Sequence, residues 1–250
     1  MHPILKEIFE KKEIKDRENN TYPLHSHTNA EQCAFIQELI LEAKPSKTLE
    51  IGLAYGISTI AILDALSELK TPFHHIVIDP FQRDAWKDIG LLNIEKGGFL
   101  DNVTFYSRFS DQVLPALYSE NARIQFAYID STKVFDILMT DVYFITKIMD
   151  INGMLVLDDC GFPGIRTLVR FLSQHPSYVI HKSFSKDPIS AKVNLLRTVY
   201  TSFLKMLPFK SRALPNYNFT RDEELGLNYN CIAFKKIKED DRDWQWHRNF

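Results

Sequence analysis

Residues 48–59, which read TLEIGLAYGIST, decide the fold of this chain. A short apolar run ends at Gly52, and a helical pattern begins after Gly56. A strand that ends in Gly-x-x-x-Gly and opens into a helix makes a tight turn, where the backbone can approach a ligand closely. In open α/β sheets, ligands bind beyond the carboxyl ends of the strands. We therefore expect a ligand site at this turn.

Strand and helix patterns alternate outward from the turn. Short apolar runs typical of buried strands occupy residues 46–52, 74–80, 102–107, 125–131, 153–159, 177–184 and 228–237. Helical patterns occupy residues 3–14, 29–44, 56–70, 82–96, 111–120, 134–150 and 164–176. Asn29, followed by Gln32, predicts a capped start for the first core helix. The alternation predicts an α/β fold: a doubly wound, mostly parallel seven-stranded sheet with an antiparallel last strand.

The domain organisation follows from one long connection. Residues 185–227 separate the last two strands, whereas most connections have roughly two to six residues. Helical periodicity inside this segment predicts a structured insertion. We therefore predict one domain over residues 30–237 with this insertion, an N-terminal lid segment over residues 1–29 and a tail over residues 238–250. The insertion and the tail also favour a homodimer.

Composition excludes several classes of function. The net charge of -2 gives no reason to expect nucleic acid as a partner. Three cysteines without a Cys-x-x-Cys pair argue against a disulfide framework, and no segment resembles a signal peptide or a membrane span. We therefore expect a cytoplasmic protein. Lys235, Lys236 and Lys238 are followed by acidic residues and read as a solvated strand end.

The residues around the turn favour one kind of cofactor. A dinucleotide site usually has three glycines in the pattern G-x-G-x-x-G, but here Ala54 and Tyr55 stand between Gly52 and Gly56. The acidic Glu50 suits a ligand with an ammonium and a sulfonium better than a polyanion. At the end of the next strand, a carboxylate can accept hydrogen bonds from both ribose hydroxyls of a nucleoside. That residue is Asp79.

The segment LEIGLAYGIST resembles the first motif of class I S-adenosylmethionine-dependent methyltransferases, E/D-x-G-x-x-x-G. The resemblance covers residues 30–184 and 228–237 and implies a Rossmann-like fold. It also implies a small-molecule methyl acceptor, methylated most often at oxygen. The residues it implies around S-adenosylmethionine are Glu50, Gly52, Ala54, Tyr55, Gly56, Ser58, Asp79, Ser110 and Asp130.

Three carboxylates follow two further strands: Asp130, Asp158 and Asp159. Strand ends meet at one edge of a parallel sheet, and Mg²⁺ prefers such oxygen ligands. The pattern is similar to the catechol and caffeoyl-coenzyme A type O-methyltransferases, where a metal orients the substrate hydroxyl. This chain departs from it at Lys133, where relatives often have histidine, and at Cys160. The alternative is that these acids bind cofactor or substrate, or cap the helices that follow.

The candidate catalytic residues are Asp130, Lys133 and His27. Lys133 is a candidate base or an electrostatic partner of Asp130. His27 lies in the N-terminal segment, together with His25, where it could reach an acceptor hydroxyl as a base. Three other functions stay open: an NAD-dependent oxidoreductase, a non-catalytic cofactor-binding relative, and a hydroxylase on a similar scaffold.

Overall fold

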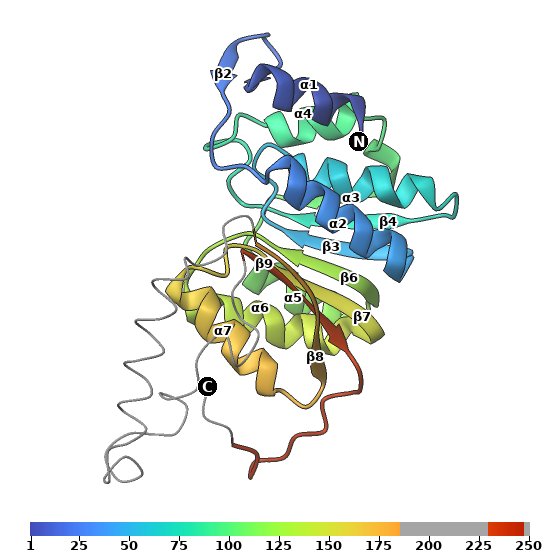
Figure 1. The fold of residues 1–250 in the computed structure, drawn as a ribbon, viewed down its shortest axis with the longest axis vertical. Helices are drawn as coiled ribbons and strands as arrows, with labels where there is room; N and C mark the ends of the chain where they lie inside the picture. Colours follow the sequence, from blue (N-terminus) through green and yellow to red (C-terminus); the bar gives the residue numbers. More distant parts are fainter. Residues whose placement is uncertain (186–229, 248–250) are drawn as a thin grey trace.

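Strand β3 (Lys47–Ile51) and helix α3 (Ile57–Glu68) flank the glycine turn, as the sequence predicts. They belong to a computed structural model that describes residues 1–185 and 230–247 (Figure 1). β3 is buried from its second residue onward, because neighbouring strands and helices cover it on all sides. The turn therefore starts from the rigid centre of the sheet.

The sheet has seven strands in the order β5-β4-β3-β6-β7-β9-β8. The strands β3 to β7 run parallel to one another, whereas β9 is antiparallel to both β7 and β8. The predicted fold class, with its antiparallel last strand, is confirmed. The strand order reverses between β3 and β6, and a crevice forms at the carboxyl ends of strands at such a point. Besides β3, the strands are β4 (His74–Ile78), β5 (Val103–Tyr106), β6 (Ile124–Ile129), β7 (Met149–Leu157), β8 (Tyr178–Phe184) and β9 (Cys231–Lys236).

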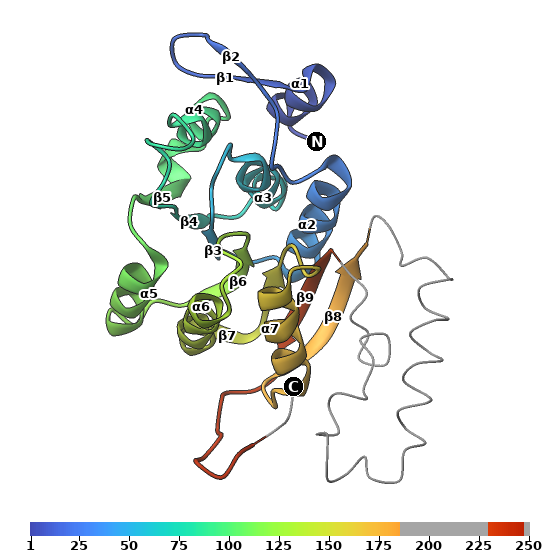
Figure 2. The ribbon, with the colours of Figure 1, turned by 90° about the vertical axis from the view of Figure 1, so that its left-hand side faces the viewer.

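Helices cover both faces of the sheet (Figure 2). The side chains of β6 show why, because they alternate between two apolar cores. Phe126 and Tyr128 pack in the core beneath α2 and α3, while Ala127 and Ile129 pack in the core beneath α5, α6 and α7. These helices are α2 (Ala30–Ala43), α5 (Ser110–Ser119), α6 (Phe135–Ile148) and α7 (Pro163–Gln174).

The N-terminal segment contains a hairpin that the sequence patterns missed. Helix α1 (Pro3–Lys11) is followed by Lys12, whose left-handed backbone ends the helix. The predicted helix over residues 3–14 is therefore too long. Strands β1 (Glu13–Lys15) and β2 (Thr21–Pro23) follow and pair antiparallel. The Asp16 carboxylate accepts hydrogen bonds from the backbone and side chains of the turn between them, which closes the hairpin.

Two helix starts test the sequence rules. α2 begins with the predicted capping box, because the Asn29 side chain accepts from the Gln32 N–H and the Gln32 side chain accepts from the Asn29 N–H. The helix predicted over residues 82–96 begins only at α4 (Ile89–Lys96). Residues before it form turns, with Asp88 in a left-handed conformation, because the Gln82 side chain donates to a carbonyl of the glycine turn. That tertiary contact overrides the local helical pattern.

The predicted solvated strand end is wrong for Lys236. Its side chain is fully buried at the end of β9, and its Nζ donates to the carbonyls of Thr146 (3.0 Å) and Met149 (2.7 Å). It also pairs with Glu239 at 2.6 Å. The two carbonyls belong to the carboxyl end of α6, where the helix dipole favours a cation.

The predicted insertion over residues 185–227 lies almost wholly outside the described residues. No helix in residues 1–185 and 230–247 combines the length and the apolar character that a membrane crossing needs.

Candidate active site

The glycine turn uses left-handed backbone conformations that favour glycine. Gly52 has a φ of 99° and Gly56, which begins α3, has a φ of 75°. A Cβ atom on Gly52 would lie 2.0 Å from the carbonyl oxygen of Asp130, so only glycine fits there. Between the two glycines, Ala54 has a φ of 47°, which is uncommon for a residue with a Cβ atom. The turn thus lies directly against the end of β6.

Asp79 follows β4 and holds the turn in shape. Its Oδ2 accepts hydrogen bonds from the backbone N–H groups of Leu53 and Ala54, both at 3.0 Å. Its Oδ1 accepts from the N–H of Phe81 at 2.7 Å. A carboxylate offers about four lone-pair positions, so Oδ1 keeps room for one further donor. Asp79 therefore links the turn to the adjacent cavity.

Glu50 is buried away from that cavity. Its carboxylate accepts hydrogen bonds from the hydroxyls of Ser58 and Thr59, both at 2.5 Å, and lies 3.2 Å from Nε2 of His75. The side chain is 0% exposed and lines neither cavity of this site. The position of Glu50 therefore does not favour the predicted contact with a cofactor. Glu50 instead anchors the first turn of α3, while Ser58 remains at the wall of the smaller cavity.

A cavity of about 560 Å³ opens at the carboxyl ends of β3, β4 and β6. Its size lies in the range of small-molecule sites, roughly 300–1,000 Å³. Five predicted site residues line it: Gly52, Ala54, Asp79, Ser110 and Asp130. Residues that the sequence analysis did not select also line it: Ile51, Ile78, Pro80, Phe81, Trp86, Phe109, Ser131, Thr132 and Ile137.

Two of the missed residues form an aromatic pair on the cavity wall. The ring centroids of Phe81 and Phe109 are 5.7 Å apart, at an interplanar angle of 86°. Both side chains are about half exposed, although phenylalanine side chains are usually more buried. They follow the carboxyl ends of β4 and β5, so their position after predicted strands was the signal available in the sequence.

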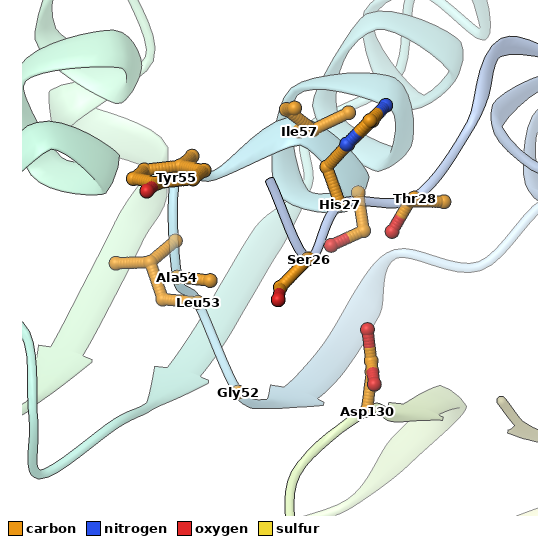
Figure 3. Close-up of a pocket in the computed structure, with 10 residues that line it drawn as sticks. Ser26, His27, Thr28, Gly52, Leu53, Ala54, Tyr55, Ile57 and Asp130 are labelled. Carbon is orange, nitrogen blue, oxygen red and sulfur yellow. The ribbon is translucent and has the colours of Figure 1, made fainter. Parts of the chain in front are cut away.

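A smaller cavity adjoins the turn, and the N-terminal segment forms one of its walls. Ser26 and Thr28 lie across from Gly52, and the Asp130 side chain points into the space between them (Figure 3). Asp130 lines both cavities, so it lies where they meet. The N-terminal segment therefore forms part of the wall of this cavity, and its role as a lid stays a prediction.

Tyr55 ties the N-terminal segment to the turn. Its hydroxyl lies 2.7 Å from Nε2 of His25, and its ring packs edge-on against Trp86 with centroids 4.9 Å apart. His25 also packs against Trp86. Tyr55 is buried and lines the smaller cavity. These aromatic contacts hold together three segments that are far apart in the sequence.

The position of His27 does not favour its predicted role as a base. The residue lines the smaller cavity, but its ring points away from Asp130 (Figure 3). It packs near Phe9, with ring centroids 6.3 Å apart. A base must come within hydrogen-bond reach of the proton that it removes.

Lys133 joins two of the acidic strand ends. Its Nζ lies 2.8 Å from Oδ1 of Asp130 and 2.9 Å from Oδ2 of Asp159. Burial acts to lower the pKa of Lys133, but the two carboxylates outweigh it and raise the pKa above its usual value. Lys133 is therefore an ammonium at neutral pH and matches the predicted electrostatic partner of Asp130 rather than the base.

The third carboxylate turns inward. Asp158 accepts hydrogen bonds from the hydroxyl of Tyr128 at 2.6 Å and from Nε2 of Gln32 at 2.8 Å. Burial raises the pKa of Asp158 to about 7. In the described part of the chain, no three His, Cys, Asp or Glu side chains are arranged to hold a metal ion. The predicted Mg²⁺ ligands Asp130, Asp158 and Asp159 therefore do not fit a metal in this arrangement.

Comparison with known families gives a match at this site. Residues 49–160, which run from the glycine turn to the acidic end of β7, match the family described as "Methyltransferase domain". Over these residues, the chain is similar to methyltransferase domains. The matched residues include both the turn and the carboxylates at the ends of β6 and β7, so the methyltransferase resemblance of the sequence is confirmed.

Solved structures share the fold of the methyltransferase domain. One is an O-methyltransferase from Bacillus cereus in complex with SAH, which is 20% identical with a TM-score of 0.58; the match covers 71% of this chain and 81% of that one. Another is an O-methyltransferase from Streptomyces achromogenes involved in tomaymycin synthesis, in complex with SAM. It is 19% identical with a TM-score of 0.53, over 62% of this chain and 73% of that one. A search of curated protein sequences finds no significant match.

Proposed function

We propose that this chain transfers a methyl group from S-adenosylmethionine to a hydroxyl oxygen of a small molecule. The observation that carries the proposal is the cavity of about 560 Å³ beside the glycine turn of a methyltransferase domain. Aromatic and aliphatic side chains provide most of its wall, and its polar side chains are those of Asp79, Ser110, Asp130, Ser131 and Thr132. A few polar groups on an apolar wall are typical of sites for small organic molecules.

The residues present fit an S-adenosyl group. Asp79 keeps a lone pair for a ribose hydroxyl, and Phe81 and Phe109 offer aromatic faces to a purine at the same end of the cavity. The smaller cavity beside Gly52 would take the amino-acid part, with Asp130 as a negative charge nearby. S-adenosylmethionine supplies a methyl group on a positively charged sulfur, and transfer forms a carbon–oxygen bond, leaves the carbon–sulfur electron pair on sulfur and releases the hydroxyl proton.

Oxygen is the proposed acceptor atom for two reasons. Both solved structures named above are O-methyltransferases. In addition, Asp130 and Lys133 lie together at the end of β6, so one group accepts and the other donates a hydrogen bond. A hydroxyl group, which does both, matches such a pair. The side of the cavity formed by Thr132 and Ile137 is where the acceptor would bind.

Calorimetric titration with S-adenosylhomocysteine tests the cofactor. We expect binding in the micromolar range by the purified chain and at least tenfold weaker binding by Asp79→Ala and by Phe109→Ala. Phe109 is half exposed, so its loss should leave the fold intact, which melting curves would verify. Asp84→Ala is the matched control, because Asp84 is an exposed carboxylate in the same connection. Binding of NADH in place of S-adenosylhomocysteine would contradict the proposal.

The acceptor can then be sought with labelled cofactor. We expect transfer of the labelled methyl group to one class within a panel of phenols, catechols and aliphatic alcohols. Transfer to amines or thiols alone would contradict the choice of oxygen.

A further inference from the structure

The end of β6 and the end of β7 are joined by one cation from the chain itself. The Lys133 ammonium bridges Asp130 and Asp159 at 2.8 and 2.9 Å. The three side chains are only partly exposed, at 25% for Lys133, 30% for Asp130 and 45% for Asp159. This is the place where the sequence predicts a divalent cation.

The backbone holds each member of this bridge in place. The carbonyl of Asp130 lies against Gly52, where a Cβ atom would approach it to 2.0 Å. The carbonyl of Lys133 lies in the same way against Gly164 in the first turn of α7, where a Cβ atom would approach it to 2.2 Å. Asp159, the second residue after β7, has a left-handed φ of 56°. The bridge is therefore set by close packing of three segments and not by a free surface side chain.

The other two candidate metal ligands, Asp158 and Cys160, are already bound to other groups. Both oxygens of Asp158 accept hydrogen bonds, from Gln32 and the N–H of Asp159 on one side and from Tyr128 on the other. The Cys160 thiol is buried and lies 3.4 Å from the carbonyl of Leu157. A Mg²⁺ ion prefers near-octahedral oxygen ligands, and of the carboxylates that end β6 and β7 in the described chain only the two already bound to Lys133 remain.

We propose that the Lys133 ammonium takes the place of a divalent cation between β6 and β7, so that this chain binds its acceptor hydroxyl through Lys133 and needs no metal. The inference rests on the proposed function, since it names the group that positions the acceptor in that reaction. An ammonium has three N–H donors, and two are used by Asp130 and Asp159. The third donates to the acceptor oxygen, and Asp130, which lines both cavities, accepts a hydrogen bond from the acceptor hydroxyl and takes its proton as the methyl group is transferred.

The charges are consistent with this arrangement. One ammonium between two carboxylates leaves one net negative charge at the bridge, beside the place proposed for a positively charged sulfur. Two carboxylates deprived of their ammonium would carry two adjacent negative charges, which favours uptake of a divalent cation. Removal of Lys133 should therefore create a metal site in the chain.

Titration with Mn²⁺, followed by the loss of its free electron paramagnetic resonance signal, tests this without any need for activity. We expect no binding to the wild-type chain up to 1 mM Mn²⁺ and at least tenfold tighter binding to Lys133→Ala. Asp130→Asn in the Lys133→Ala background should abolish the gained binding. Lys87→Ala is the matched control, because Lys87 is an exposed lysine whose ammonium lies over the Tyr22 ring and is not part of the bridge. Submillimolar Mn²⁺ binding by the wild-type chain, or no gain in Lys133→Ala, would overturn the inference.

Activity gives a second readout. With an acceptor in hand, we expect methyl transfer by the wild-type chain to be unchanged by EDTA. We expect Lys133→Met to raise KM for the acceptor at least tenfold, while binding of S-adenosylhomocysteine stays within twofold. Loss of transfer in EDTA that Mg²⁺ restores would overturn the inference. Failure of the proposed function would show separately, as absence of S-adenosylhomocysteine binding, whatever the Mn²⁺ titration gives.

Discussion

Asp141 makes stability depend on pH. Its carboxyl lies on α6 with a side chain that is 0% exposed. Burial raises the pKa of Asp141 from 3.8 to about 7, and the nearby Ser110 side chain offsets this only in part. The folded chain therefore keeps a proton that the unfolded chain releases between about pH 4 and pH 7. Because the folded state binds more protons in this window, the free energy of unfolding falls as the pH rises through it.

The size of the effect follows from the two pKa values of Asp141. Each pH unit between them corresponds to about 1.4 kcal/mol, so the full destabilisation at pH 8 is about 4 kcal/mol. At pH 5 the carboxyl is largely protonated in the folded chain, and the destabilisation is about 1.7 kcal/mol. Asp141→Asn removes the titration. We therefore expect the wild-type chain to lose about 2.5 kcal/mol more stability than the variant between pH 5 and pH 8.

Urea unfolding, followed by circular dichroism at pH 5 and pH 8, measures this difference. Asp136→Asn is the matched control, because Asp136 is exposed in the first turn of the same helix. The control should keep the pH dependence of the wild-type chain within about 0.5 kcal/mol. Other buried carboxyls contribute equally to all three proteins and cancel. If Asp141→Asn and the wild-type chain lost equal stability between the two pH values, the account of Asp141 would be refuted.

Three further predictions concern the turn and the last strand. Gly52→Ala should lower the melting temperature and abolish S-adenosylhomocysteine binding, because its Cβ atom would collide with the carbonyl of Asp130. Ala54→Gly should raise stability by about 1 kcal/mol, because glycine adopts the left-handed φ of 47° without strain. A lower melting temperature for Ala54→Gly than for the wild-type chain would contradict this. Lys236→Ala should cost about 3 kcal/mol in urea unfolding by leaving two buried carbonyls without a donor, whereas Lys235→Ala on the same strand should cost under about 0.5 kcal/mol. Equal losses would show that the buried bonds of Lys236 contribute nothing.

Much of the fold could be read along the chain, because its signals are local. Short apolar runs indicate the buried strands, and the helical period of apolar residues indicates the helices between them. Gly52 and Gly56 mark the turn because their backbone conformations exclude most other residues. Asn29 and Gln32 likewise carry their capping box within four residues. The mostly parallel direction of the strands followed from the alternation of these elements, since parallel strands need helical crossovers.

Other features depended on contacts that no local pattern contains. Glu50 has the residue type of a cofactor ligand, yet its carboxylate is used by the start of α3 and by His75. Lys236 reads as a surface residue, yet it meets the carboxyl end of α6. Residue type alone did not predict where the side chains of Glu50 and Lys236 point, because partners elsewhere in the sequence set the direction of each.

The sequence by itself determined the doubly wound sheet, the turn at its centre and the set of polar residues at the strand ends. Only the tertiary structure decided how those residues are used. It turned Asp158 inward to Tyr128 and brought Lys133 between Asp130 and Asp159. The physical reason is that strand ends share an edge by topology, whereas the direction of each side chain is set by close packing and by competition for hydrogen-bond partners.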